Sequence, residues 1–162
     1  MRLAIISDTH LPRGSRALPG RCVALCAEAD VILHAGDLVT MDVLDELRAL
    51  GPPVVAVHGN VDRADVRAAL PESVVEELGG VRVGMVHDGG PSSGRVQRLR
   101  RRFPDADAVV FGHSHIPLHE AVGGFQIFNP GSPTDRRRQP RHTMGVATAG
   151  GGRIAFEHVV LD

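Results

Sequence analysis

The chain has 162 residues, of which 43% are hydrophobic, and its formal net charge is -1 at pH 7. This length suits one domain with a sizeable core, the hydrophobic share is too high for a disordered chain, and no apolar run reaches the roughly 18 residues of a membrane span. A nearly neutral charge, with five phenylalanines as the only aromatic residues among Phe, Trp and Tyr, argues against a nucleic-acid groove.

The first half of the chain alternates apolar strands with helices. It begins with MRLAIISDTH, which reaches a carboxylate too early for a signal peptide, so a cytoplasmic location is expected. Short apolar runs predict strands at residues 3–7, 31–34 and 54–58. Helical spacing predicts helices at residues 21–29, 41–50 and 62–70. Asp62 is a candidate N-cap of the last helix, and the alternation favours βαβ units around a parallel sheet.

The second half is mainly strands. Residues 74–78 and 81–86 flank the pair Gly79-Gly80, which indicates a hairpin. One more helix is predicted at residues 93–103. The remaining strands are expected at residues 108–111, 118–122, 125–128, 144–148 and 154–160. The chain therefore starts as α/β and ends mostly antiparallel, and no repeat or linker divides residues 1–162 into more than one domain.

Side chains that can bind metals follow five of the predicted strands, at the point where each strand ends. The five segments read SDTH, HAGD, HGNVD, HDGG and GHSH. Because loops at the carboxyl ends of strands converge in α/β proteins, residues far apart in the sequence can form one site. The candidate ligands are two aspartates, one asparagine and four histidines: Asp8, His10, Asp37, Asn60, His87, His113 and His115.

This ligand set suits a pair of divalent metal ions. Imidazole suits zinc, iron, nickel or manganese, carboxylate and amide oxygens suit manganese or magnesium, and the lack of thiolates argues against a structural zinc site. Each motif alone is weak, because a Gly-Asp pair is usually only a turn. Their conjunction in one chain predicts the metal site. Gly36, Gly59 and Gly112, beside the ligands, are expected to allow positive φ or the close approach of a metal or phosphate.

In this order the motifs resemble the calcineurin-like metallophosphoesterase superfamily: Asp8-x-His10, Gly36-Asp37, Gly59-Asn60, His87 and Gly112-His113-x-His115. The short chain, the LHAGD and GNVD versions and the later NPGS at residues 129–132 resemble its small YfcE-type branch. The resemblance covers residue 3 to about residue 132. It implies a four-layer α/β/β/α sandwich with two mixed β-sheets, the metallo-dependent phosphatase fold.

The resemblance also implies a role for each ligand. One divalent ion would be held by Asp8, His10 and His115. A second would be held by Asn60, His87 and His113, and Asp37 would bridge the two. Manganese is the favoured metal, with nickel, iron, zinc and magnesium as alternatives. The family mechanism would be in-line attack of a metal-bound hydroxide on a small phosphodiester or phosphate ester, with Asp37, Asn60 and His87 as the expected catalytic residues.

Five further residues are candidates for supporting the site or contacting substrate: His34, Asp62, Asn129, Ser132 and Arg141. His34 could hydrogen-bond near the ligands, and Asp62 is explained equally well as a helix cap. One arginine of the loop at residues 136–141 could pair with a phosphate, because a guanidinium matches phosphate bidentately. The arginines of the helix at residues 93–103 are expected to face solvent.

Two positions depart from the family pattern. Larger phosphatases of the superfamily carry a histidine near the leaving group where this chain has Val61, which favours diesters with good leaving groups. Asp88 follows His87 where glycine is common. It either orients His87 or faces water, and we favour water.

Two functions therefore compete. The first is a metal-dependent phosphodiesterase. The second is a non-catalytic protein-interaction scaffold on the same fold, as in eukaryotic retromer, where metal ligands have been altered. All seven ligand positions carry competent side chains here, which favours the enzyme. The small branch often forms dimers or larger assemblies, so a homo-oligomer is also open.

Overall fold

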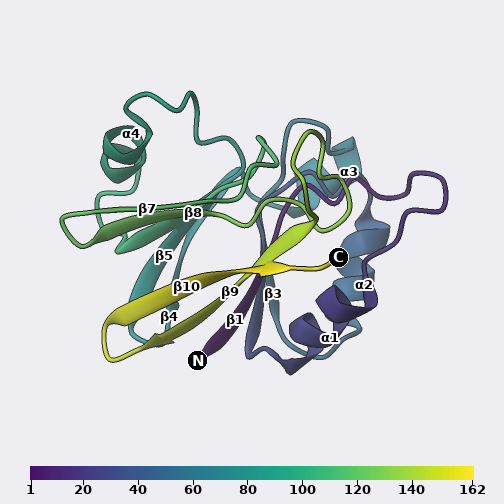
Figure 1. The fold of residues 1–162 in the computed structure, drawn as a ribbon, viewed down its shortest axis with the longest axis horizontal. Helices are drawn as coiled ribbons and strands as arrows, with labels where there is room; N and C mark the ends of the chain where they lie inside the picture. The colour runs from purple at the N-terminus through teal and green to yellow at the C-terminus, as the bar shows by residue number, and fades with distance from the viewer.

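A computed structural model describes residues 1–162 and contains two stacked β-sheets (Figure 1). The first sheet joins the beginning of the chain to its end. Its strands are, in spatial order, β10 (Arg153–Val160), β9 (Thr143–Gly150), β1 (Arg2–Ile6), β2 (Val31–His34) and β3 (Val54–Ala56). Strands β1, β2 and β3 are parallel, whereas β9 and β10 are antiparallel. The sheet is therefore mixed.

The second sheet is formed by the middle of the chain. Its strands are, in spatial order, β4 (Ser73–Leu78), β5 (Val81–Val86), β6 (Ala108–Val110), β8 (Phe125–Asn129) and β7 (Leu118–Val122). Strands β5, β6 and β8 are parallel, and the outer strands β4 and β7 are antiparallel to their neighbours. Gly79 and Gly80 have φ of +60° and +80°, so the predicted hairpin turn is confirmed.

Strand β1 is buried on both faces, and this burial is the reason why it is apolar throughout. Leu3 and Ile5 point into the core between the two sheets, where Val83 and Met85 of β5 also lie. Ala4 belongs to the core on the other face of the first sheet. Because successive side chains of a strand point to opposite faces, a strand buried on both faces reads as a continuous hydrophobic run.

Four helices form the outer layers. Helices α1 (Gly20–Glu28), α2 (Met41–Arg48) and α3 (Ala64–Ala69) contribute to the core on the outer face of the first sheet. Helix α4 (Arg95–Arg102) covers the second sheet, with Val96 and Leu99 in a third core (Figure 1). The expected four-layer α/β/β/α sandwich with two mixed sheets is confirmed. None of these helices has the length and apolar character needed to span a membrane.

Some predicted boundaries and pairings are wrong. Helix α3 begins at Ala64, its N-cap is Arg63, and no side chain caps it, so Asp62 is not a helix cap. Strand β3 ends at Ala56, and the backbone N–H of His58 donates to Pro71 instead of continuing the ladder. The second half is also less antiparallel than predicted, because β6 pairs in parallel with both of its neighbours.

Candidate metal centre

The ends of strands from both sheets bring the predicted ligands together. Six of them form two groups, one of Asp8, His10 and His115 and the other of Asp37, His87 and His113. Within each group the ligand atoms all lie within 4.8 Å of one another. The seventh residue, Asn60, places its Oδ1 3.1 Å from His87 Nε2 and 3.1 Å from His113 Nδ1. Asn60 therefore belongs with the second group.

Asp37 lies between the two groups. Its Oδ2 is 3.4 Å from His10 Nε2 and 3.2 Å from His87 Nε2. Its Oδ1 accepts a hydrogen bond of 3.0 Å from the backbone N–H of Val61. One carboxylate oxygen thus faces a histidine of each group, while the other oxygen fixes the orientation of the side chain.

The residues present fit divalent metal ions. Asp8 Oδ1 and His10 Nε2 are both buried without a hydrogen-bond partner. Leaving such atoms unpaired is costly, and coordination of a shared cation would satisfy both lone pairs. The donors are carboxylate and amide oxygens and imidazole nitrogens, which suit several borderline divalent ions.

The ligands themselves have unusual backbone conformations. Five of the seven lie in the left-handed region, with φ between 46° and 70°: Asp8, His10, Asp37, His113 and His115. This region is unfavourable for residues with a Cβ, and such strain concentrates at functional sites. The tight turns after β1, β2 and β6 therefore depend on the surrounding hydrogen bonds to hold them.

The glycines beside the ligands have different roles. Gly36 has φ of +95°, as expected for a turn that requires glycine. Gly59 and Gly112 do not have positive φ, so only the second part of the expectation, a close approach, applies to them. A Cβ on Gly59 would collide with Asp37 Oδ1, and one on Gly112 would collide with Ser7 Oγ. These two glycines make room for protein side chains.

Hydrogen bonds outside the ligand groups orient the imidazoles. His87 Nδ1 donates to the backbone carbonyl of Ala35 over 2.7 Å, and His115 Nδ1 donates to the carbonyl of Asp135. Each bond directs Nε2 of the same ring towards the site. Asp88 does not orient His87: it is exposed, and its Oδ1 accepts from the backbone N–H of Gly90. The expectation that Asp88 faces water is therefore confirmed.

Asp62 holds together the loops that follow β2 and β3. Its buried carboxylate accepts three backbone N–H bonds, from Asp37 at 3.1 Å, Val39 at 2.5 Å and Gly59 at 2.6 Å. His34 is also buried: its Nδ1 accepts from Gly36 and its Nε2 donates to Thr9 Oγ1, each over 3.1 Å.

His34 and Asp62 therefore shape the loops that carry the ligands. Burial lowers the pKa of His34 to about 3, so its imidazole is neutral.

The three remaining candidates for supporting the site or contacting substrate are Asn129, Ser132 and Arg141, and only the first two lie against the candidate ligand loops. Asn129 and Ser132 are buried and brace the ligand loops: Asn129 Nδ2 donates to Gly112, and Ser132 Oγ donates to the carbonyl of Asp8. Both therefore contact protein rather than the open side of the site. Arg141 does not join them, because its guanidinium donates to the carbonyl of Asp162 at the end of the chain. The predicted phosphate contact by Arg141 has no support in this geometry.

Sequence reasoning missed the role of two arginines in α4. Arg95 donates twice to the carbonyl of Gly90, and Arg98 donates twice to that of Gly89. These residues do not simply face solvent, as expected, but fix the loop that follows His87. The signal available in the sequence is the pair Gly89-Gly90, which Arg95 and Arg98 follow closely along the chain.

Burial and charge shift the protonation of the ligands. Burial raises the pKa of Asp8 to about 7. Burial opposes the charged form of His87, but its hydrogen bond to Asp37 and the charges of Asp8 and Asp37 outweigh this and raise its pKa to about 9. Burial would raise the pKa of Asp37, yet the hydrogen bond and charge of His87 lower it below the ordinary value.

The raised pKa of His87 predicts that the metal-free protein loses stability as the pH rises above about 7.5. Below that pH the lowered pKa values of His10, His34 and His115 act in the opposite direction, because the unfolded state then binds the extra protons. The folded-state pKa of His87, about 9, lies above its ordinary value of 6.5, and that of Asp8, about 7, lies above 3.8. In both cases the folded state binds more protons than the unfolded state, so each group lowers the free energy of unfolding through its own interval, and His87 acts above the interval of the other histidines. Urea unfolding with a chelator at pH 7.5, 8.2 and 9.0 measures the fall caused by His87. A free energy that stays level or rises contradicts it, and His87→Gln should flatten the alkaline part.

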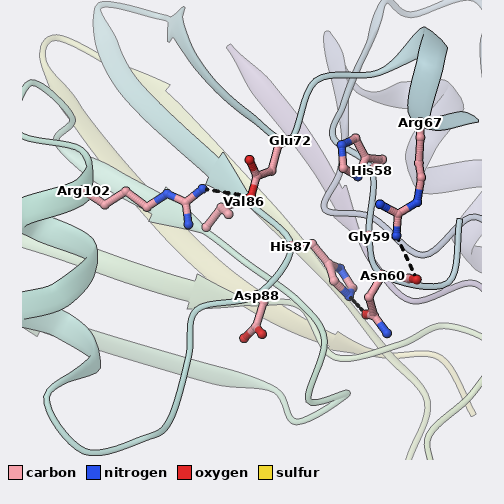
Figure 2. A pocket seen from close by; sticks show the side chains of 9 residues that line it. All are labelled: His58, Gly59, Asn60, Arg67, Glu72, Val86, His87, Asp88 and Arg102. Atoms are coloured by element: carbon pink, nitrogen blue, oxygen red, sulfur yellow. Dashed lines mark hydrogen bonds and ion pairs between the residues drawn. The ribbon is translucent and has the colours of Figure 1, made fainter.

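A pocket of about 200 Å³ opens beside the second ligand group. Asn60 and His87 form part of its wall, and the other residues that line it are mostly polar or charged. Figure 2 shows His87 pointing to Asn60, with Arg67 above them and Asp88 turned away. The pocket therefore lies directly against the site and has a polar character.

Comparisons with known proteins agree with this geometry. The model of the calcineurin-like phosphoesterase superfamily domain matches residues 1–152. A protein named probable metallophosphoesterase, from Methanothermobacter thermautotrophicus, is 37% identical over 136 residues, which cover 83% of this chain and 78% of that protein. A phosphodiesterase of Methanocaldococcus jannaschii is 26% identical over 143 residues, covering 81% and 83%. The structure of wild-type Vps29 complexed with zinc, from Entamoeba histolytica, has a TM-score of 0.78 at 24% identity over 100% of both chains, which shows a shared fold.

Proposed function

The chain belongs to the calcineurin-like phosphoesterase superfamily, and from this premise we propose that it is a phosphodiesterase that uses two divalent metal ions to hydrolyse small phosphodiesters. The observation that carries the proposal is the position of Asp37. Its Oδ2 lies within 3.4 Å of His10 Nε2 and 3.2 Å of His87 Nε2, one from each ligand group. A carboxylate oxygen shared in this way is what a bridging ligand requires.

The proposed roles follow the two groups. Asp8, His10 and His115 would hold one ion, and Asn60, His87 and His113 the other, with Asp37 shared. Such a pair supplies a nucleophile at neutral pH and a clamp for the phosphoryl oxygens. Manganese is the favoured metal because the donors mix imidazole with oxygen, and nickel, iron, zinc and magnesium are alternatives.

The preference for diesters rests on Val61. This residue is 42% exposed, and it follows the proposed ligand Asn60 directly. It offers no proton to a leaving group, so esters whose alcohols leave readily as anions are the better substrates. We therefore expect aryl diesters to be hydrolysed faster than unactivated monoesters.

The test is hydrolysis of bis(p-nitrophenyl) phosphate by metal-stripped protein to which manganese, nickel, magnesium, zinc or no metal is added. We expect turnover only with metal, together with two ions bound per chain. Absence of turnover with every metal, despite two bound ions, would exclude the phosphodiesterase. The scaffold function would then be favoured, for which the fold shared with Vps29 is the supporting observation.

A further inference from the structure

The pocket beside the second ligand group contains a cation with no acidic partner. Arg67, on α3, donates from Nε to the carbonyl of Asp62 and from Nη2 to the carbonyl of Asn60, each over 3.0 Å. A guanidinium has five N–H groups, so three remain free to bind a ligand. The two backbone bonds hold the guanidinium against Asn60 in advance, which reduces the entropy lost when a ligand binds.

The other charged residues of the pocket are either paired or turned away from Arg67. Arg102 lies 3.6 Å from Glu72. Asp88 Oδ1 accepts from the backbone N–H of Gly90 over 2.8 Å, and Figure 2 shows its side chain turned away from Arg67. Arg67 takes part in none of the ion pairs of the chain. Asp88 also has no ion-pair partner, but on the side of the pocket beside Asn60 the unpaired charge is positive.

Building on the proposed phosphodiesterase function, we propose that Arg67 binds an oxyanion carried by one alcohol portion of the diester. The class of substrate is a phosphodiester with a small alcohol that bears a carboxylate or a second phosphate. The volume of about 200 Å³ is below the roughly 300–1,000 Å³ of pockets that bury drug-sized ligands. Only one of the nine lining residues is hydrophobic, so a bulky apolar group would find little surface to contact.

Three matched substrates test the proposal: the p-nitrophenyl phosphodiesters of propanol, 3-hydroxypropionate and ethanolamine. Their second ester groups have similar size and end in a methyl, a carboxylate and an ammonium. With manganese, we expect kcat/KM for the carboxylate ester to exceed that for the propyl ester by about tenfold, the effect of one charge-assisted contact. The gain should lie mainly in KM, because the contact is made equally in the ground and transition states.

Arg67→Gln should reduce this preference to less than about twofold, because the charge-assisted contact is lost. Arg63→Gln is the matched control, since Arg63 is the exposed N-cap residue of the same helix and does not line the pocket. It should keep the full preference. Calorimetric titration of the wild type and both variants with 2-carboxyethyl phosphate and propyl phosphate repeats the comparison without turnover.

Several outcomes would overturn the proposal. One is a wild-type enzyme that does not prefer the carboxylate ester, or that prefers the ammonium ester. Another is an Arg67→Gln variant that loses activity equally on all three esters and keeps its preference, since Arg67 would then only position Asn60. If no ester is hydrolysed with any metal, the proposed phosphodiesterase itself fails, and this proposal with it.

Discussion

Replacing Asp37 by alanine is expected to lower kcat for bis(p-nitrophenyl) phosphate by at least about 100-fold, more than the loss typical of residues that only orient metal ligands. The reason is that Asp37 Oδ2 faces a histidine of each ligand group. Asp8 Oδ1 also faces both groups but lies farther away, at 3.9 Å from both His10 Nε2 and His87 Nε2. With Asp37 as the proposed shared ligand, both ions would lose a ligand at once. Steady-state kinetics with manganese, combined with elemental analysis of bound metal, measures both effects.

Two further variants make the Asp37 result specific. Asp45→Ala removes a carboxylate from the exposed surface of α2, where its side chain is 68% exposed, and should leave activity and metal content unchanged. Asp37→Asn keeps an oxygen that can accept from Val61 but loses the negative charge. It should therefore retain the fold and lose metal. An Asp37→Ala enzyme with full activity and two bound ions would contradict the proposed bridging role.

Replacing Asp62 by asparagine is expected to lower the free energy of unfolding by about 3 kcal/mol, the cost of leaving buried donors unsatisfied. Its Oδ2 accepts from Asp37 and Gly59, and its Oδ1 accepts from Val39. An asparagine has only one oxygen, so its amide group must turn an N–H towards a backbone N–H. The same loops carry Asp37 and Asn60, and activity should fall as well.

Urea unfolding with a chelator present measures the effect of Asp62→Asn apart from metal binding. Asp65→Asn is the matched control, because Asp65 is exposed and its Oδ1 accepts only from the neighbouring Val66. This control should change the free energy of unfolding by no more than about 0.5 kcal/mol. An Asp62→Asn protein as stable as the control would mean that the three bonds are not important for the fold.

The residues of the candidate metal centre could be predicted from the sequence because they belong to short motifs at strand ends. Hydrophobic periodicity places the strands, and polar side chains directly after them must converge at one edge. The same reasoning could not assign β9 and β10 to the first sheet. Strand order depends on packing between residues such as Leu3 and Ala147, which are paired across the sheet but far apart in sequence.

The supporting residues were harder to assign for a different reason. Asp62 precedes a helix, and a carboxylate there is usually a cap. Whether it caps α3 or accepts from Asp37 and Gly59 is decided by the path of two loops, which local pattern does not determine. No sequence pattern singles out Arg67, and Arg98 is expected to face solvent, because the partners of both are backbone carbonyls that only the folded chain brings near.

The position of the ligand groups between the sheets has a mechanical consequence. Each group draws on both sheets: Asp8 and His10 follow β1 whereas His115 follows β6, and Asp37 follows β2 whereas His87 follows β5. A coordinated ion would therefore link loops of the two β-sheets. Its binding free energy would oppose separation of the sheets. Resistance to proteolysis and chemical activity would then depend on the same coordinate bonds, and a cell short of metal would lose both together.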